Sequence, residues 1–191
     1  MQNLHKINIK WNLVDPEMLE DDELFRIFNE WISESTEEVL IDVADYKHLD
    51  HGPTTILIGH DANYFLESVN ETKGLVYARK RLLEGDFTKR ISSILFASLN
   101  GCIKLENHPE FQGRLKFDGS EVRFTANDRL YAPNTNENIE LFKQHLSPAL
   151  DILFSPNKYT FENSDQPKER LTVTVRTTET AGLSDLIKNV A

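Results

Sequence analysis

The stretch RLKFDGSEVRFT, residues 114–125, carries the strongest local signal for the fold. At its centre stands Asp118-Gly119, a dipeptide typical of two-residue β-hairpin turns. A slip of one residue in the pairing would turn all the apolar side chains of one strand to the other face of the hairpin. A two-residue loop instead puts all the apolar residues of the stretch on one face: Leu115, Phe117, Val122 and Phe124. The pattern therefore predicts two antiparallel strands joined at residues 118–119.

Strands and helices are also predicted on both sides of this hairpin. Alternating or short apolar runs predict strands at 7–13, 39–43, 54–59, 63–69, 75–80, 159–161 and 171–175. Apolar residues at helical spacing predict a helix that includes residues 24–32, a central core helix after Asp86 and a third helix after Thr135. Pro148 lies inside the third helix and is expected to kink it, or to split it with Ser147 as a new cap.

The order of these elements predicts the fold class. Hairpins force antiparallel pairing, and only the first strand-helix-strand unit could be parallel. We therefore expect an α+β fold, in which three main helices pack on one face of a largely antiparallel sheet. Residues 1–180 are expected to form a single α+β domain, and 181–191 a C-terminal amphipathic tail. That tail is too short to be a stable helix unless it docks on the domain or on a partner.

Composition and charge exclude several classes of protein. The chain has 191 residues, 39% hydrophobic and 27% charged, which excludes a disordered or collagen-like chain. Its formal net charge of -10 opposes binding to nucleic acid or to an anionic membrane. A single cysteine, Cys102, cannot form an internal disulfide, and no apolar leader or membrane-spanning run occurs. These features predict a cytoplasmic protein without nucleic-acid or membrane partners.

Most of the net negative charge lies in and around the first predicted helix. Residues 15–38 contain ten acidic side chains and a single basic one, Arg26. Charge runs of this kind usually form a solvated helix face. The alternative is a structural or interaction subunit, in which the acidic helix docks on a basic partner.

A second cluster combines histidines and carboxylates in and around one polar loop. His48, Asp50, His51 and His60 are candidate metal ligands, because imidazole and carboxylate are natural ligands of zinc, iron and manganese. Their spacing matches no known metal motif. His60 and Asp61 are also candidate catalytic residues, since a carboxylate beside a histidine can orient it as a general base. The loop therefore suggests a metal-dependent enzyme, hydrolytic or oxidative, although turn-forming roles explain the same residues.

A third cluster is basic and follows a predicted strand. Residues 73–90 contain six basic side chains against two acidic ones. Among them, Arg79, Lys80 and Arg81 are candidate anion-binding residues, because arginine can hold a carboxylate or phosphate with two hydrogen bonds. Partners on the acidic helix offer a purely structural explanation for the same cluster.

The leading hypothesis from the sequence is a small binding protein. It would bind a small anionic molecule or an acidic peptide at Arg79, Lys80 and Arg81, with the histidine loop at the rim. A free sheet edge and an apolar tail both favour a homodimer. No cofactor motif is evident, and a divalent metal belongs only to the enzyme alternative.

Overall fold

A computed structural model describes residues 1–36, 38–46, 53–69, 72–163, 166, 168–179 and 181–191. Its strands are β1 (Ile7–Leu13), β2 (Leu40–Asp45), β3 (Thr55–Gly59), β4 (Ala62–Val69), β5 (Thr72–Arg79), β6 (Phe117–Ala126), β7 (Tyr159–Asn163) and β8 (Thr172–Thr177). They form one eight-stranded sheet in the order β2-β3-β4-β5-β1-β6-β8-β7. Every described pair of neighbouring strands is antiparallel, and β1 does not pair with β2. The predicted antiparallel sheet is confirmed. β1 and β2 run in the same direction but are separated by β3, β4 and β5, so the first strand-helix-strand unit forms no parallel pair.

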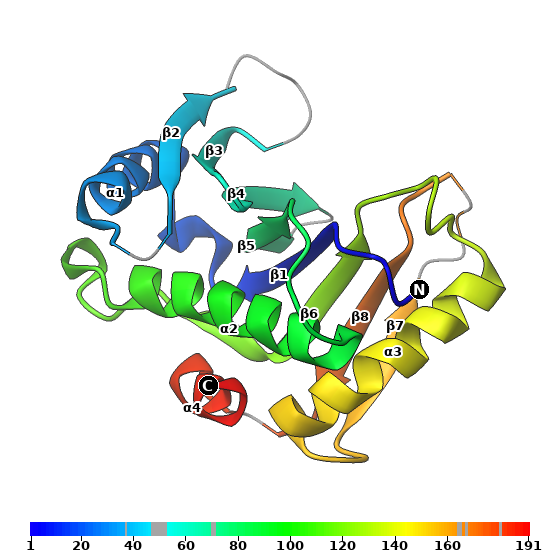
Figure 1. Cartoon of the computed structure of the whole chain (residues 1–191). Helices are drawn as coiled ribbons and strands as arrows, with labels where there is room; N and C mark the ends of the chain where they lie inside the picture. The colour runs from blue at the N-terminus through cyan, green and yellow to red at the C-terminus, as the bar shows by residue number, and fades with distance from the viewer. Residues whose placement is uncertain (37, 47–52, 70–71, 164–165, 167, 180) are drawn as a thin grey trace.

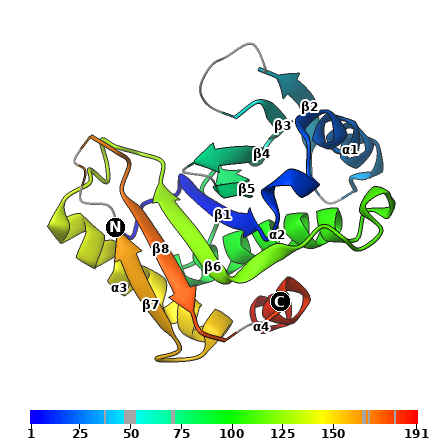
Figure 2. The same ribbon diagram turned by 180° about the vertical axis from the view of Figure 1, so that it is seen from behind.

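The helices lie together on one face of this sheet (Figure 1). They are α1 (Asp21–Glu34), α2 (Phe87–Glu106), α3 (Asn136–Phe154) and the short C-terminal α4 (Leu183–Val190). α1 contacts β2 and β3, α2 crosses β1 and β5, and α3 lies on β7 and β8. Seen from behind, the other face of the sheet carries no helix of the described chain (Figure 2). The α+β class with three main helices on one face is therefore confirmed.

Local sequence signals explain where most helices begin. Asp86 accepts a hydrogen bond from the backbone N–H of Lys89 at the start of α2, and Thr135 caps α3 in the same way. Before the first helix, Asp15 caps a single 3-10 turn, Pro16–Met18. α1 begins later, where Glu20 and Glu23 form a reciprocal capping box.

The core lies between the helices and the inner face of the sheet. Trp11 is fully buried at its centre, and its indole N–H donates a hydrogen bond of 3.0 Å to the Ser98 hydroxyl on α2. This bond satisfies a buried donor and fixes α2 over β1. Cys102 is buried on the same helix, and burial raises the pKa of its thiol well above the ordinary value. A buried thiol of this kind is a poor nucleophile.

The predicted hairpin at residues 118–119 is wrong. Residues 117–126 form the single strand β6, which pairs with β1 on one side and β8 on the other. A register shift opposite Trp11 and Leu13 changes which residues face the core, from 117 and 119 to 122, 124 and 126. This irregularity keeps Leu115, Phe117, Val122 and Phe124 buried, as the sequence predicted, without a turn.

Two further expectations concern the last helices. α3 continues through Pro148 to Phe154, so the predicted split at Ser147 is wrong. The C-terminal tail forms α4, which docks on the domain itself, against α2, α3 and β6. Its apolar residues Leu183 and Leu186 are almost fully buried there. None of the described helices combines the length and the apolar character that crossing a bilayer requires.

Candidate functional site

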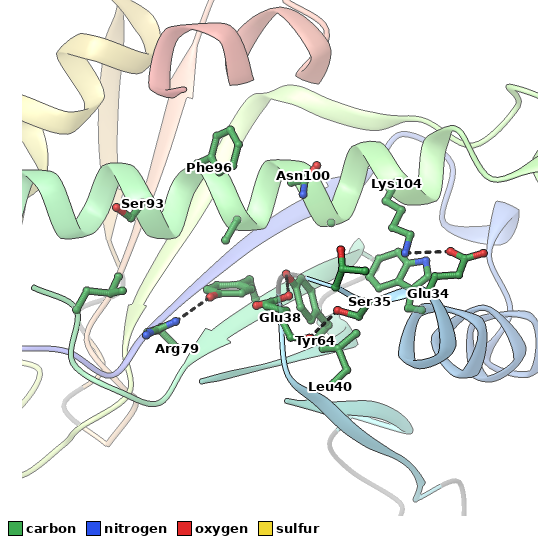
Figure 3. A pocket seen from close by; sticks show the side chains of 16 residues that line it. Glu34, Ser35, Glu38, Leu40, Tyr64, Arg79, Ser93, Phe96, Asn100 and Lys104 are labelled. Atoms are coloured by element: carbon green, nitrogen blue, oxygen red, sulfur yellow. Dashed lines mark hydrogen bonds and ion pairs between the residues drawn. The ribbon is translucent and has the colours of Figure 1, made fainter. Parts of the chain in front are cut away.

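A cleft of about 420 Å³ opens between α2 and the edges of α1, β4 and β5 (Figure 3). Four elements contribute to it: the C-terminal end of α1, the connection from α1 to β2, the strand pair β4–β5, and one side of α2. The residues that line it are Trp31, Glu34, Ser35, Thr36, Glu38, Leu40, Tyr64, Tyr77, Arg79, Leu83, Ser93, Phe96, Ala97, Asn100, Gly101 and Lys104. The cleft therefore combines aromatic, aliphatic and charged side chains.

Three aromatic rings form the floor of the cleft. Tyr64 and Tyr77 are directly opposite each other on β4 and β5, and their ring centroids are 5.0 Å apart in an edge-to-face arrangement. Trp31 of α1 meets Tyr64 edge to face at 5.8 Å. Gly101 of α2 allows this packing, because a Cβ atom there would lie 2.7 Å from Cε1 of Tyr64.

Arg79 occupies one end of the cleft, as Figure 3 shows. Its side chain is only 11% exposed. Nε donates a hydrogen bond of 2.8 Å to the Arg81 carbonyl, and Nη1 lies 3.5 Å from the Tyr77 hydroxyl. Nη2 is 3.8 Å from Oδ1 of Asp61, a longer ion pair. These contacts hold the guanidinium in place and leave part of its donor capacity for a ligand.

Glu38 lies between Arg79 and the other end of the cleft (Figure 3). The Tyr64 hydroxyl donates a hydrogen bond of 3.0 Å to Oε2 of Glu38. Burial raises the pKa of the Glu38 carboxyl, and the Tyr64 hydrogen bond and the Arg79 charge only partly oppose this shift. The cleft therefore contains a carboxyl group that takes up a proton more readily than an exposed glutamate.

An ion pair closes the far end of the cleft. Nζ of Lys104 lies 3.4 Å from Oε2 of Glu34 and 4.9 Å from the centroid of the Trp31 ring. The ammonium is thus engaged by a carboxylate and by an aromatic face at once. Two cations line the cleft. The ion pair of Arg79 with Asp61, at 3.8 Å, is longer than that of Lys104 with Glu34, so Arg79 is the cation that is held less closely by a carboxylate.

The three predicted anion-binding residues point in different directions. Arg79 lines the cleft on the helical face and, together with Lys80, a hollow on the opposite face; Lys80 donates a hydrogen bond to the Gly59 carbonyl. Arg81 is exposed and does not line the cleft. Alternation along β5 and the residues after it explains the separation of Arg79 from Lys80. Arg79 and Arg81 together line a smaller pocket, but none of these cavities is lined by all three side chains, and their joint role in binding an anion stays a prediction.

The predicted His60–Asp61 contact is present at the turn between β3 and β4. Nδ1 of His60 lies 3.2 Å from Oδ1 of Asp61, and the two side chains are 47% and 43% exposed. Asp61 also faces Arg79, so the histidine loop and the basic segment adjoin at this carboxylate. The catalytic role of this pair stays a prediction.

The predicted metal ligands His48, Asp50 and His51 lie outside the described residues. In the part of the chain that the structure does describe, no three histidine, cysteine or acidic side chains gather closely enough to hold a metal ion. His60 is the fourth predicted ligand. Its ring contacts Asp61, and its backbone N–H donates a hydrogen bond to the Val39 carbonyl. The metal-dependent enzyme therefore stays a prediction.

The acidic face of α1 finds its cations elsewhere than the sequence suggested. Glu30 contacts His108 at 3.0 Å and Glu34 contacts Lys104, both near the C-terminal end of α2. From the basic segment 73–90, Lys73 instead donates a hydrogen bond to the Leu19 carbonyl before α1. The acidic helix is thus partly neutralised within the chain, by cations that sequence proximity did not indicate.

Sequence reasoning found Arg79 and missed the rest of the cleft. Trp31, Tyr64 and Tyr77 occupy apolar positions of amphipathic elements, which indicate core residues. Glu38 stood within an acidic run that predicted a solvated face. No known protein-family model matches the chain, and no curated protein sequence is significantly similar to it.

Proposed function

We propose that this protein binds a small molecule with a flat ring and an anionic group in the cleft beneath α2. The anionic group would pair with Arg79, and the ring would lie over the tyrosine and tryptophan floor. This proposal narrows the sequence hypothesis to one of its three basic residues. The main observation in support of this proposal is the position of the Arg79 guanidinium. It is largely buried at the end of an aromatic cleft and donates a hydrogen bond to the Arg81 carbonyl.

The chemistry of the cleft supports a ligand of this type. A partly buried guanidinium forms stronger hydrogen bonds to an anion than an exposed one, because water competes less. Leu40, Leu83 and Ala97 add aliphatic surface around the aromatic floor. Pockets for small ligands characteristically combine such apolar walls with a few convergent polar groups. Glu38, when ionised, would accept a hydrogen bond from a donor on the same ligand.

The first test compares ligands that share a ring and differ in charge. Benzenesulfonate, benzyl alcohol and benzylammonium can be titrated into the protein and followed by ligand-detected NMR. We expect benzenesulfonate to bind most tightly, and the variant Arg79→Gln to weaken it about tenfold, the loss typical of one charged hydrogen bond. Arg81→Gln is the matched control, since this exposed arginine lies outside the cleft lining. Equal losses in both variants, or tighter binding of benzylammonium, would contradict the proposal.

Binding of benzenesulfonate should also depend on pH through Glu38. The sulfonate stays ionised, so the ligand charge does not change. As the pH falls through the raised pKa of Glu38, its carboxylate is neutralised near the anion, and affinity should rise roughly threefold. Other charged groups that face this part of the cleft are Glu34, Asp61, Arg79 and Lys104.

The variant Glu38→Gln isolates the contribution of this carboxyl. Its amide can still accept the hydrogen bond from Tyr64, so the cleft should keep its shape. We expect its affinity for benzenesulfonate to be independent of pH in this range and close to the acid limit of the unmodified chain. If the pH dependence persists in Glu38→Gln, another group is responsible and this part of the proposal fails.

Two expectations from the sequence complete the proposed function. We propose that the protein works in the cytoplasm, where the single buried thiol of Cys102 would stay reduced. We also propose a homodimer, because β2 and β7 are unpaired edge strands of the described sheet, and β2 with its flank exposes Val39 and Ile41. Light scattering after size-exclusion chromatography tests the dimer, and a mass of 22.0 kDa would contradict it.

A further inference from the structure

The face of the sheet opposite the helices is polar and rich in cations. Along the central strands, the side chains that alternate with the core residues point to that face. The register aligns them in rows across the strands, one of which runs Phe65, Val76, Lys10, Arg123 and Thr174 from β4 to β8. Figure 2 shows this side of the molecule, with β1, β6 and β8 in front of the helices. This face lies across the sheet from the cleft, but Arg79 lines both the cleft and one hollow on this face, so variants elsewhere on the face must separate a ligand here from the proposed function.

Two cations stand directly opposite each other in this row. Lys10 on β1 is the partner of Arg123 on β6, and like charges in such a position repel. The Lys10 side chain is only 3% exposed, and its ammonium lies 3.3 Å from Oε2 of Glu67. No carboxylate of the described chain forms an ion pair with Arg123. Glu67 lies on β4, on the side of Lys10 away from Arg123, so it pairs with the lysine alone and the two neighbouring cations favour an anion from outside.

The sheet is built to accommodate the lysine. Gly74 of β5 lies opposite Asn12 of β1 and Glu67 of β4. A Cβ atom at Gly74 would be 2.9 Å from Cε of Lys10 and 2.3 Å from the Trp11 carbonyl oxygen. The glycine therefore leaves a trough in which the lysine stem crosses β5 toward Glu67. The ammonium is held just beneath the surface of this face.

Further cations surround two hollows on the same face. The hollows have volumes of about 770 and 680 Å³ and share the residues Glu67 and Arg170. Within the described residues, the following lining side chains form no ion pair: Lys6, Arg123, Arg129, Lys168 and Arg170. This concentration of unpaired positive charge belongs to a chain whose net charge is -10. The groove formed by the two hollows, hereafter the basic groove, is thus a local exception to the charge of the molecule.

We propose that the basic groove binds a short chain of phosphate groups. Several cations spaced along one groove match several successive negative charges better than a single carboxylate. Thr125 and Thr174 add hydroxyl donors, which commonly contact phosphate oxygens. A long nucleic acid would also meet the acidic remainder of the protein, which repels it, whereas a ligand of groove size would not. The shared chemistry is an oligophosphate, either free or carried by a nucleotide.

Calorimetric titration in low-salt buffer without divalent cations tests this site. The probes are tripolyphosphate, ATP, adenosine and citrate. We expect tripolyphosphate and ATP to bind, adenosine to give no signal, and citrate to bind at least tenfold more weakly than tripolyphosphate. Tighter binding of ATP than of tripolyphosphate would identify a nucleotide as the source of the phosphates, and equal binding a free oligophosphate. Absence of binding by both would overturn the proposal, and citrate binding as tightly as tripolyphosphate would overturn the choice of phosphate.

Variants on the surface of the groove locate the site. We expect Arg123→Gln and Arg170→Gln each to weaken tripolyphosphate at least tenfold, and raised salt to weaken it further. Arg114→Gln removes the same charge from an exposed arginine that does not line the groove, so its affinity should stay within twofold. Equal losses in all three variants would show a nonspecific charge effect and overturn the site. Binding of benzenesulfonate in the cleft should be unchanged in each variant, which separates the two proposals.

Discussion

Replacing Gly119 by alanine should lower the free energy of unfolding by about 3 kcal/mol, at the upper end of what an overpacked site costs. Gly119 is buried in β6, where a Cβ atom would lie 2.1 Å from the carbonyl oxygen of Ala181. Its backbone does not have a positive φ, so alanine could adopt the same conformation. The expected loss therefore comes from space alone.

Relief of this clash requires the backbone at Ala181 to move away from β6. Ala181 leads directly into α4, whose Leu183 and Leu186 are buried against the domain. We expect the variant to loosen α4 as well as to destabilise the domain. Urea denaturation measures the loss of stability of the whole chain, and faster hydrogen exchange of the α4 amides measures the loosening of α4.

Gly182→Ala is the matched control for this experiment. Gly182 follows Ala181 and precedes α4, but a Cβ atom there meets nothing within 4 Å. Its φ of -69° suits alanine, and a change from glycine to alanine at a helix N-cap costs less than about 1 kcal/mol. If Gly119→Ala were no more destabilising than Gly182→Ala, the close approach of β6 to residue 181 would be refuted.

The same glycine shows what the sequence could predict and what it could not. The alternation of Leu115 and Phe117 with Val122 and Phe124 correctly identified four core residues. A hairpin turn and an irregular strand both change the phase of alternation by one residue, so the pattern alone could not separate them. The close approach of Gly119 to Ala181 shows that residue 119 lies in a strand, and this contact joins segments 62 residues apart in the chain. Local dipeptide preferences carry no information about such a contact.

Element identity was predictable because periodicity is a local property. The alternation in 7–13 predicted both ends of β1, and the apolar stripe after Asp86 predicted α2. Strand order was not predictable, since hydrophobic patterns do not say which strands pair. The placement of β1 at the centre of the sheet, between β5 and β6, depends on pairings over long sequence separations.

The candidate sites were harder to predict for the same reason. Tyr64 and Tyr77 occupy core positions of their strands, and only their packing beside α2 makes them a cleft floor. In the sequence, Lys10 and Arg123 occupy positions that alternate with the core residues of two strands, where solvent exposure is expected. Their juxtaposition became visible only when the register of β1 on β6 was known. Arg79 could be singled out because its local sequence is unusually basic in an acidic chain.

Replacing Lys10 by methionine should stabilise the protein and weaken oligophosphate binding at the same time. The lysine ammonium is almost fully buried, and burial lowers its pKa although Glu67 opposes the shift. Replacing both members of a buried ion pair by apolar side chains is often stabilising by about 1–4 kcal/mol, whereas removing one member is costly only where the remaining charge stays buried. Methionine can follow the same trough over Gly74, and Glu67, being 37% exposed, can be solvated by water once its partner is gone. We expect a gain of about 2 kcal/mol at neutral pH.

The pH dependence of this gain follows from the direction of the pKa shift. Below the lowered pKa of folded Lys10, the group is charged in both the folded and unfolded chain, so the full cost of burying the charge is present. As the pH rises from that value toward the ordinary pKa of lysine, folding releases the proton and the cost is relieved. The stability difference between Lys10→Met and the unmodified chain should therefore be largest at neutral pH and shrink toward about pH 10.

Urea denaturation at both pH values, with Lys6→Met as control, tests this prediction. Lys6 lies on the same side of the molecule but is exposed, so its replacement should change stability by less than about 0.5 kcal/mol. Tripolyphosphate affinity should fall roughly fivefold in Lys10→Met, because the buried ammonium acts on the groove through its field. A loss of stability in Lys10→Met would mean that the ion pair with Glu67 stabilises the fold. A gain together with weaker oligophosphate binding would instead mean that the buried charge serves binding at a cost to stability, as functional sites commonly do.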